Sequence, residues 1–289
     1  MSEANYCIIY NPISGNKKGA IYAEQLKEKF NVEECVDITT IENYEDFFCK
    51  HKSCNLIICG GDGTLNRFVN DIADIELESG IFFFPCGSGN DFCRDIESDG
   101  TELICLDKYI KELPTCTVNG KEYKFINGIG YGIDGYCCEV GDKLRLESDK
   151  SINYTGIAIK GLLFHYKPTS ATVTVDGVKH EFKKVWIAPT MLGRYYGGGM
   201  MPTPNQDRSN ENGELSVMIF HDTTNIQTLM LFPSVFKGEH IKKAKKVTIL
   251  TGKDITVEFS EPRALQIDGE TIPNVKAYSA RSAKVLAKI

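Results

Sequence analysis

The stretch Asn55-Leu-Ile-Ile-Cys-Gly60-Gly61-Asp62-Gly63-Thr64-Leu65-Asn66 decides the fold class that we expect for this chain. The apolar run after Asn55 is typical of a buried strand, and the adjacent glycines then break the strand in a tight turn. Thr64 suits the N-cap of a following helix, whose spacing continues through Phe68 and Val69. A buried strand that turns directly into a helix predicts a βαβ unit in a parallel sheet.

The same alternation extends from the start of the sequence to about Glu112. Apolar runs stand at Tyr6–Tyr10, Val36–Ile38, Asn55–Cys59 and Ile81–Phe84, and helical spacing stands at Gly19–Phe30, Tyr44–Lys50 and Leu65–Ile75. Buried runs separated by helices indicate a parallel sheet whose two faces are both covered. We therefore expect an α/β domain over residues 1–118.

After about Cys116 the pattern changes to short strands separated by turn residues. Period-2 runs stand at Ala171–Val175, Glu181–Ile187, Leu215–Phe220, Lys246–Leu250, Ile255–Phe259 and Ala264–Ile267, and a further pair of strands flanks the Asn119-Gly120 turn. Helical spacing interrupts the series at Ile152–Phe164 and Ile226–Phe236. This pattern predicts an antiparallel β-sandwich over residues 119–279. A final strand at 280–289 could return to the first domain, although the pattern does not show it.

The charge and cysteine content of the chain bear on the class of protein to which it belongs. The chain has 289 residues with 33 Lys and Arg against 39 Asp and Glu, a net charge of −6 that does not favour nucleic-acid binding. Its 11 cysteines are scattered without a Cys-x-x-Cys pair, and the beginning of the sequence lacks the pattern of a signal peptide. We therefore expect reduced thiols and a cytoplasmic location.

The turn at Gly60–Thr64 is the strongest candidate for chemistry. Adjacent glycines let a ligand approach the backbone, and the amides at a helix N-terminus favour phosphate. The Asp62 carboxylate could hold Mg²⁺ or orient a nucleophile; the alternative is a tight turn in which Asp62 only bonds to nearby backbone. Two further turns follow predicted strands, at Asn11–Lys17 and Phe84–Arg94. Turns at the carboxyl ends of parallel strands build one crevice, where open α/β sheets bind ligands.

Together these turns resemble a known family. The motifs Asn11-Pro12-x-Ser14-Gly15, Gly60–Thr64 and Pro85-x-Gly-Ser-Gly-Asn-Asp-Phe92 resemble the soluble diacylglycerol kinase catalytic domain, which bacterial diacylglycerol kinases share with sphingosine and ceramide kinases. The resemblance continues through Phe125–Asp134, Tyr195–Pro204 and Ile267–Glu270, so it covers almost the whole chain in order. It implies an α/β domain similar to those of NAD kinase and phosphofructokinase, followed by a β-sandwich domain for the lipid substrate.

The resemblance also implies an activity and its residues. The family transfers phosphate from ATP, with Mg²⁺, to a lipid hydroxyl, most often turning diacylglycerol into phosphatidic acid. It implies Glu270 as general base and Asp62 as a second catalytic residue, and substrate contacts at Asp91 and Arg94. The implied ATP contacts are Asn11, Thr39 (or Thr40), Gly60, Gly61, Asp62, Gly63, Thr64, Asn66 and Ser88. Family members are often dimers, so a homodimer is also expected.

Two positions depart from the family pattern. Arg67 stands where the family usually has Glu, which reverses a charge beside the Gly60–Thr64 turn. In the loop that holds a structural Mg²⁺ in the family, Asn212 replaces the usual Asp, although Mg²⁺ prefers carboxylates. By position the ligands would be Ser209, Asn212 and Glu214; alternatively Asp207 or Glu211 substitutes, or the loop holds no metal.

Several alternatives remain at this stage. The acceptor could be a sphingoid base, another lipid alcohol or NAD, or the chain could be a catalytically silent relative that binds nucleotide or lipid. Asp268-Gly269-Glu270 also reads as a plain hairpin turn with a solvated glutamate. The apolar segment Ile226–Phe236, followed by lysines, fits either peripheral contact with a membrane surface that holds the lipid substrate or a core-facing helix.

Overall fold

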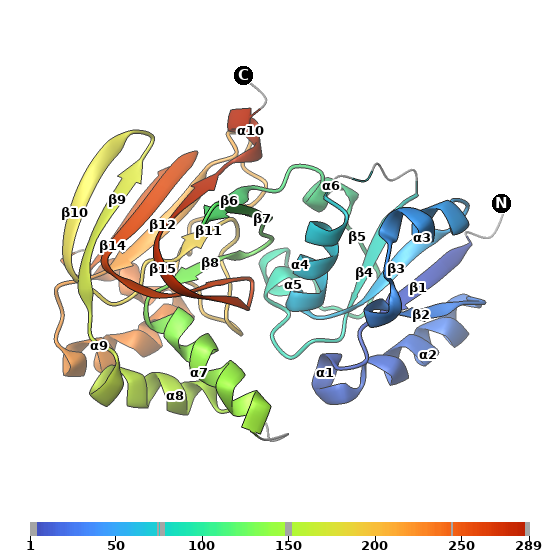
Figure 1. The fold of residues 1–289 in the computed structure, drawn as a ribbon, viewed down its shortest axis with the longest axis horizontal. Coiled ribbons are helices and arrows are strands. Elements are labelled where there is room, and N and C mark those ends of the chain that lie inside the picture. The colour runs from blue at the N-terminus through green and yellow to red at the C-terminus, as the bar shows by residue number, and fades with distance from the viewer. Residues whose placement is uncertain (1–4, 74, 76–78, 148–151, 244, 287–289) are drawn as a thin grey trace. The chain divides into compact units, whose positions relative to one another are not determined.

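The computed structural model describes residues 5–73, 75, 79–147, 152–243 and 245–286. The chain divides into two compact units, Met1–Leu113 and Pro114–Ile289. The sequence placed the boundary near residue 118, but the strand Thr115–Val118 pairs with strands of the second unit and therefore belongs to it. Figure 1 shows both units, the first coloured blue to cyan and the second green to red.

The first unit is a five-stranded sheet in the order β2-β1-β3-β4-β5, with helices in its connections. Its strands are β1 (Tyr6–Tyr10), β2 (Cys35–Asp37), β3 (Asn55–Gly60), β4 (Ile81–Pro85) and β5 (Ile104–Cys105). Its helices are α1 (Ser14–Lys17), α2 (Gly19–Phe30), η1 (Ile38–Thr40), α3 (Tyr44–Lys50), α4 (Asp62–Asp71), α5 (Asp91–Asp95) and α6 (Asp107–Ile110). All neighbouring strands run parallel except β4 and β5.

Both faces of this sheet are buried, which explains its uninterrupted apolar strands. Ile8 of β1 is paired in register with Ile57 of β3, and both belong to the apolar cluster that includes Ala23 and Leu26 of α2. Because successive strand residues alternate in direction, Ile9 lies on the opposite face, where it is also fully buried. The predicted parallel α/β architecture of this unit is confirmed.

The second unit is built on a ten-stranded antiparallel sheet. Its strands are β6 (Thr115–Val118), β7 (Lys121–Lys124), β8 (Gly128–Tyr131), β9 (Thr169–Val175), β10 (Val178–Val185), β11 (Thr190–Met191), β12 (Leu215–Phe220), β13 (Val247–Gly252), β14 (Asp254–Ile267) and β15 (Glu270–Arg281). Its helices are α7 (Ile133–Glu147), α8 (Tyr154–Lys160), α9 (Asn225–Leu231), α10 (Ala283–Leu286) and the short turns η2 (Gly161–His165), η3 (Phe232–Lys237) and η4 (Glu239–Lys242).

The long strand β14 connects the parts of this sheet. Its first half, Ile255–Phe259, pairs with β9, and its second half, Leu265–Ile267, pairs with β8. The register against β15 shifts between Glu258 and Leu265, so the strand bends at a bulge. The sequence predicted two strands here, and the structure shows one strand that bends between them. A bent strand lets one chain segment serve both layers of a sandwich.

Hairpin turns in this unit follow their residue chemistry. Asn119-Gly120, Asp176-Gly177 and Asp268-Gly269 all have positive φ at both positions, as the favoured two-residue hairpin turn requires. The predicted helical stretches near 152–164 and 226–236 are also present, as α8 with η2 and as α9 with η3. The predicted antiparallel sheet of this unit is therefore confirmed.

Helix α7 and the C-terminal segment are among the elements that differ from the sequence prediction. Helix α7 was not predicted, because its buried face consists of small residues such as Gly135, Cys137 and Gly141 rather than large apolar ones. Gly135 allows close packing, since a Cβ there would lie 2.0 Å from the carbonyl oxygen of Ala264. At the other end, Ala283–Leu286 form a short helix where a strand was expected, and residues 287–289 lie outside the described part.

Two further structural facts bear on the class of protein. Within the described ranges, no helix has the length and apolar character needed to cross a bilayer. All eleven cysteines are free thiols. The buried sulfur atoms of Cys59 and Cys86 lie 3.6 Å apart, and Cys59 is the residue before the last one of β3.

Burial in the sandwich core allows a prediction about the free energy of unfolding. Ile219 of β12 is fully buried in the apolar cluster of the sheet, whereas Ile226 at the start of α9 is 66% exposed. Ile219→Ala should therefore lower the free energy of unfolding by about 2–5 kcal/mol, and Ile226→Ala should change it by less than about 0.5 kcal/mol. Urea unfolding of the two variants measures both. Equal losses would contradict this assignment of core and surface.

Candidate functional site

Three loops meet at the carboxyl edge of the first sheet, because β1, β3 and β4 are parallel neighbours and end together. The Asn11 N–H donates to the Cys59 carbonyl (3.1 Å), and the Cys86 N–H donates to the Gly60 carbonyl (2.8 Å). These bonds continue the sheet ladder one residue beyond the strands. They hold the starts of the loops after β1, β3 and β4 at fixed positions.

The Thr64 hydroxyl joins two of these loops. Asn11 Nδ2 donates to Thr64 Oγ1 at 2.9 Å, and Ser14 Oγ lies 3.1 Å from the same oxygen. The other end of the Asn11 side chain accepts the Ile13 N–H at 3.1 Å. The sequence predicted Thr64 as the helix N-cap, which is wrong: Gly61 is the N-cap, and Thr64 lies inside the first turn of α4. Its hydroxyl is therefore available for the loop after β1.

Glycine is required where the loops cross. A Cβ on Gly87 would lie 2.6 Å from the Gly61 Cα, and a Cβ on Gly15 would lie 2.4 Å from the Cys86 carbonyl oxygen. Contacts this short to backbone cannot be relieved by a rotamer change. Gly63 differs, because a Cβ there would meet no atom within 4 Å. The space beside Gly63, at the N-terminus of α4, is therefore open.

Asp62 connects the loop after β3 to the loop after β4. Its two carboxylate oxygens accept the backbone N–H groups of Asp91 (3.0 Å) and Phe92 (2.9 Å) at the start of α5. Charge-assisted bonds of this kind are stronger than neutral ones. The structure therefore gives Asp62 a positioning contact, while its predicted catalytic role stays a prediction.

The loop after β4 presents several polar groups. Ser88 is exposed, and Asn90 has a left-handed backbone with φ of 48°. The buried Asn90 Oδ1 has no hydrogen-bond partner among the described residues. Asp91 is buried, and Arg94 is partly exposed with its guanidinium 3.7 Å from the Asp91 carboxylate. The two predicted substrate contacts, Asp91 and Arg94, are therefore adjacent to each other.

The remaining predicted nucleotide contacts stand in the same unit. Asp37 accepts both the Thr39 N–H (2.9 Å) and the Thr39 hydroxyl (2.8 Å), so Thr39 is held in the turn after β2. Asn66 is buried on α4. Arg67, the departure from the family pattern, is exposed and lies 3.6 Å from the Asp71 carboxylate one turn along α4. Its charge is thus directed along the outer face of the helix.

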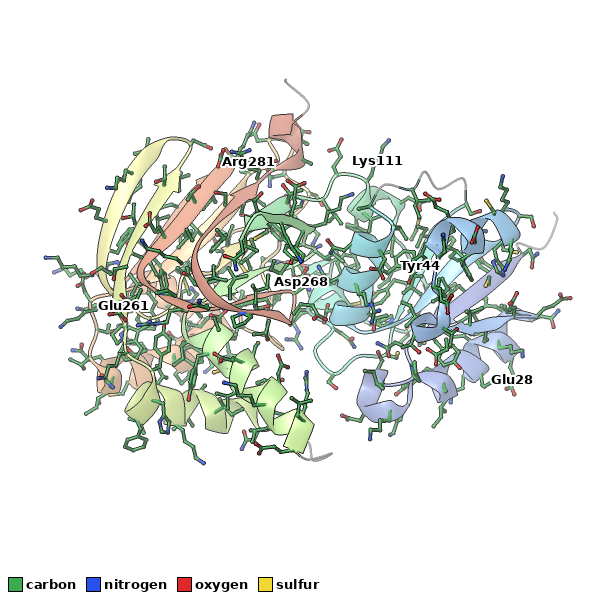
Figure 2. The ribbon with its side chains drawn as sticks, viewed as in Figure 1. Glu28, Tyr44, Lys111, Glu261, Asp268 and Arg281 are labelled. Atoms are coloured by element: carbon green, nitrogen blue, oxygen red, sulfur yellow. The ribbon has the colours of Figure 1, made fainter. Side chains whose placement is uncertain are left out.

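In the second unit, Asp268 is the anchor of the β14–β15 hairpin (Figure 2). Its carboxylate accepts three backbone N–H groups, from Ile126 (2.5 Å), Asn127 (2.9 Å) and Gly128 (2.9 Å). This arrangement fixes the segment that leads into β8. Sequence reasoning treated Asp268 only as a turn residue, because a partner more than a hundred positions away leaves no local pattern.

Glu270, the predicted general base, begins β15 one residue beyond the turn. It is exposed, and within the described ranges no group forms a hydrogen bond or ion pair with its carboxylate. An exposed, unpaired carboxylate on a hairpin that Asp268 anchors is held in place through its backbone alone. This geometry leaves the Glu270 carboxylate accessible to a proton donor.

A buried polar network lies behind this hairpin and was missed by sequence reasoning. Tyr196 donates its hydroxyl to the Asp134 carboxylate at 3.0 Å, and the Gln266 side chain also bonds to that carboxyl group. The Gln266 Oε1 in turn accepts the Gly269 N–H at 2.7 Å, next to Glu270. A Cβ on Gly130 would lie 1.7 Å from the Asp134 carboxylate, which explains the glycine there.

Burial raises the pKa of the Asp134 carboxyl from its ordinary value of 3.8 to about 6, although hydrogen bonds from Tyr196, the local backbone and Gln266 oppose the shift. Burial, with the neighbouring Asp134 charge, also raises the pKa of Tyr196 well above its ordinary value, so its phenol stays a donor. The network therefore holds a carboxyl group that changes charge just below neutral pH.

The predicted metal loop is closed by a different residue. Asn210 donates to the carbonyl oxygens of Asp207 (2.7 Å) and Glu214 (2.9 Å), and its Oδ1 accepts the Glu214 N–H (2.7 Å). Ser209 and Asn212, two of the three predicted ligands, are exposed. The Asn210 amide thus links the two ends of this loop. Metal binding here stays a prediction.

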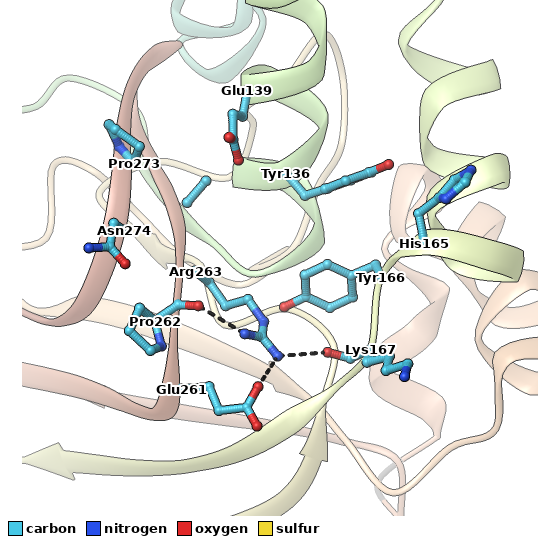
Figure 3. Close-up of a pocket in the computed structure, with 11 residues that line it drawn as sticks. Tyr136, Glu139, His165, Tyr166, Lys167, Glu261, Pro262, Arg263, Pro273 and Asn274 are labelled. Carbon is cyan, nitrogen blue, oxygen red and sulfur yellow. Dashed lines mark hydrogen bonds and ion pairs between the residues drawn. The ribbon is translucent and has the colours of Figure 1, made fainter.

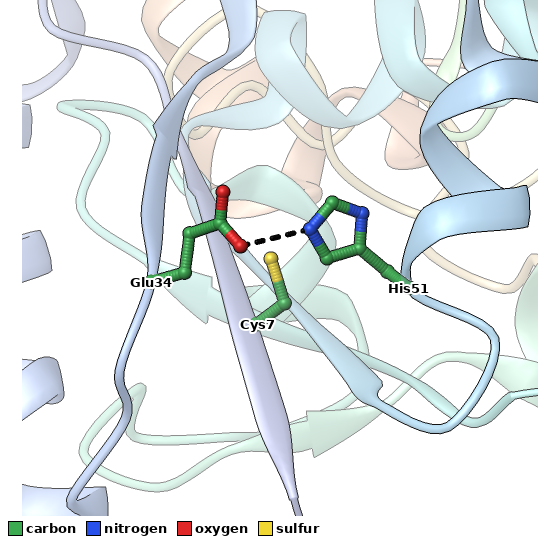
Figure 4. A group of neighbouring side chains, drawn as sticks. All are labelled: Cys7, Glu34 and His51. Carbon is green, nitrogen blue, oxygen red and sulfur yellow. Dashed lines mark hydrogen bonds and ion pairs between the residues drawn. The ribbon is translucent and has the colours of Figure 1, made fainter.

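In the described part of the chain, one trio of His, Cys and acidic side chains brings its ligand atoms within 4.8 Å of one another: Cys7, Glu34 and His51 (Figure 4). His51 Nε2 lies 2.9 Å from the Glu34 carboxylate, Nδ1 lies 2.7 Å from the Phe47 carbonyl, and the ring stacks on Phe47. We interpret this group as an ion pair that ties α3 to the start of β2.

A cavity of about 500 Å³ in the second unit lies beside α7 (Figure 3). Arg263 is its main cation, and it donates to the Pro262 and Lys167 carbonyls and to the Glu261 carboxylate. It also lies over the Tyr166 ring. The guanidinium of Arg263 is thus bonded within the pocket wall, and Lys167 also lines the cavity.

Comparisons with known proteins agree with this architecture. Residues 5–116 match the diacylglycerol kinase catalytic domain, and residues 127–287 match the YegS C-terminal NAD kinase beta sandwich-like domain. The two matches together cover both units. The chain belongs to the family of lipid kinases that combine these two domains, the diacylglycerol kinase family, as the sequence resemblance indicated.

Individual relatives are distant but nearly full-length. The Bacillus subtilis protein named "putative lipid kinase YtlR" is 27% identical over 301 residues, which cover 92% of this chain and 93% of that protein. The diacylglycerol kinase of Bacillus subtilis is 25% identical and covers 91% of this chain and 88% of its own. A solved Bacillus anthracis structure, titled a putative diacylglycerol kinase, aligns with a TM-score of 0.64 at 19% identity over 97% of this chain and 92% of that one, which supports the fold.

The pKa of the buried Asp134 carboxyl group leads to a prediction about how stability depends on pH. This pKa is raised in the folded protein, so the folded state binds the proton more tightly than the unfolded state between pH 4 and pH 6. Relative to Asp134→Asn, the wild-type protein should gain up to about 3 kcal/mol of stability as the pH falls from 7 to 4. Urea unfolding of both proteins across this range measures the difference. A difference that does not vary with pH would contradict it.

Proposed function

We propose that this protein transfers the γ-phosphate of ATP to the hydroxyl group of a membrane lipid, with diacylglycerol as acceptor and phosphatidic acid as product. The observation that carries the proposal is the crossing of the three loops. Gly61 and Gly87 meet backbone to backbone, Thr64 bonds to Asn11, and the space beside Gly63 stays open at the N-terminus of α4. Helix N-termini favour anionic phosphate groups, and a kinase family requires a nucleotide site.

The first unit supplies the proposed nucleotide contacts. Backbone amides at Gly61–Thr64 would bind phosphate oxygens, with Asn11 and Ser88 at the rim and Thr39 after the neighbouring strand. The buried Asn90 Oδ1, which has no hydrogen-bond partner among the described residues, offers an acceptor beside the glycine crossing for a hydroxyl or amino group of the nucleotide. The Mg²⁺ that accompanies ATP neutralises phosphate charge when bound. Asp62 positions the loop, and Arg94 offers a cation next to buried Asp91.

The second unit supplies the proposed base. The lipid hydroxyl oxygen attacks the γ-phosphorus, the bond from that phosphorus to the β–γ bridging oxygen breaks, and ADP leaves with the bridging oxygen. The hydroxyl proton passes to the Glu270 carboxylate. Glu270 suits this role because its carboxylate is exposed and unpaired among the described residues, while Asp268 and the Gln266–Gly269 bond fix the hairpin that carries it.

Kinase-family membership and the position of Arg67 favour activity over a silent relative. Arg67 is exposed and pairs with Asp71, so the reversed charge does not enter the group of loop side chains that bond to Thr64. The choice among acceptors depends on the reaction product. Diacylglycerol leads because relatives from Mycobacterium tuberculosis and Bacillus subtilis are named diacylglycerol kinase.

The nucleotide site is tested with two glycine variants. Gly63→Ala should leave thermal stability unchanged, since its methyl group meets no protein atom. It should weaken ATP binding by about tenfold or more, because the methyl group enters the space proposed for phosphate. Isothermal titration with ATP and Mg²⁺ measures the affinity.

Gly87→Ala is the matched control for that experiment. Its methyl group would collide with the Gly61 backbone, so this variant should lose stability as well as ATP affinity. Wild-type ATP affinity in Gly63→Ala would show that no phosphate lies beside Gly63.

Glu270→Gln tests the proposed base. Because the side chain is exposed and unpaired in the described structure, the variant should fold and bind ATP normally. Transfer of labelled phosphate to dispersed diacylglycerol should fall by at least about 10²-fold. A variant that keeps wild-type turnover would remove Glu270 from the mechanism. Wild-type protein that binds ATP but labels no lipid acceptor and no NAD would favour the silent relative.

A further inference from the structure

We propose that the outer face of α8, η2, α9, η3 and η4 binds the surface of an anionic lipid bilayer. This face exposes six large apolar side chains: Ile159, Phe164, Ile226, Met230, Phe236 and Ile241. We call it the α8–η4 face. The inference rests on the proposed function, because a lipid acceptor with two acyl chains resides in a membrane.

Helix α9 carries two of these exposed apolar side chains. Ile226 and Met230 are one helical turn apart and are 66% and 68% exposed, while Thr228 between them is buried. One side of the helix is therefore buried, and these two large side chains lie outside the core. A capping box at Thr224 and Gln227 fixes the start of the helix.

The helices next to α9 pack on the same buried cluster as each other. The Asn225 amide donates to the Leu162 carbonyl at 2.9 Å, which joins α9 to η2. Ile157 of α8, Leu162 of η2 and Val235 of η3 all belong to one buried cluster. Because these helices cover one core, their outer sides face away from it together. Phe164, 75% exposed, therefore belongs to the same outer surface as Ile226 and Met230. Figure 1 shows α8 and α9 at the same end of the sandwich.

Charge identifies the partner. Residues 152–167 and 225–246 contain seven lysines and one glutamate, a net charge of +6 in a chain whose total is −6. The remainder of the chain therefore carries −12. Six of these lysines are exposed, at positions 160, 167, 237, 242, 243 and 245. An apolar surface with lysines beside it matches the boundary between acyl chains and anionic headgroups, where each lysine adds about 1 kcal/mol.

The same charge disfavours a second copy of this chain as occupant. A two-fold dimer through this face would place the same patch on both subunits, so the two lysine groups would oppose each other. A bilayer of anionic lipid has the opposite sign of charge and requires no complementary shape. The face is therefore better suited to a membrane than to self-association.

Vesicle sedimentation without nucleotide tests the proposal. The probes are vesicles of phosphatidylcholine alone and vesicles that also contain phosphatidylglycerol. The wild-type protein should sediment with the anionic vesicles, and binding should fall as the salt concentration rises. Ile226→Gln/Met230→Gln should reduce the binding constant at least about tenfold, and so should Lys242→Glu/Lys243→Glu.

Two matched controls separate this face from general effects. Val178 is 58% exposed and begins β10 directly after the β9–β10 turn, and this turn lies at the other end of the sandwich from α8 and α9 in Figure 1, so Val178→Gln should leave vesicle binding unchanged. Lys108→Glu/Lys111→Glu makes the same change of charge at α6 and its C-cap in the first unit, and it should have a much smaller effect than the pair at the end of η4. Equal losses in the controls and the face variants would overturn the proposal.

Activity on a short-chain, monomerically dissolved diacylglycerol separates this proposal from the proposed function. Face variants should keep wild-type turnover on that acceptor and lose turnover on vesicle-bound diacylglycerol. Wild-type protein that phosphorylates the soluble acceptor without binding anionic vesicles overturns the membrane proposal alone. Protein that binds vesicles through this face but phosphorylates no lipid overturns the proposed function alone. Dimerisation that Ile226→Gln/Met230→Gln abolishes would assign the face to a second copy and overturn the membrane proposal.

Discussion

The backbone contact between Gly61 and Gly87 is the constraint on which the candidate nucleotide site depends. A Cβ on either residue would press into the other loop, so the loops after β3 and β4 reach this separation only with glycine at both positions. The Asp62 carboxylate then holds the second loop by two N–H groups, and Thr64 holds the loop after β1. The carboxyl edge of the sheet is thus preorganised by its own polar groups, and the open space beside Gly63 remains for a ligand.

The second unit uses the same device, a carboxylate that collects backbone N–H groups. Asp268 binds three of them and thereby fixes the hairpin that carries Glu270. Behind the hairpin, the buried Asp134 links Tyr196 and Gln266, so the loop that contains Tyr196 and the hairpin share one polar network. An aspartate in each unit therefore positions the backbone, and the proposed base is left exposed. The two acids of the Asp268-Gly269-Glu270 turn therefore have different environments.

The distribution of charge and apolar surface adds a third level of organisation. The chain is acidic in total, yet one end of its sandwich concentrates lysines beside apolar side chains that the core does not use. For an enzyme whose proposed acceptor lies in a bilayer, such a face would set the orientation of the sandwich on the membrane. The net charge alone does not show this arrangement, because it is a sum over the whole chain.

Local periodicity and short motifs such as Gly60–Thr64 were sufficient to predict the α/β and β architecture, most strand positions and the family. They also located the Asn119-Gly120 and Asp268-Gly269 turns, whose positive φ values follow from residue type. The carboxylates that hold the backbone became visible only in the folded structure. The partners of Asp62 and Asp268 lie far along the chain, and α7 buries glycines and cysteines that show no helical pattern. Contacts between distant segments depend on how the strands pair, and local sequence patterns do not indicate that pairing.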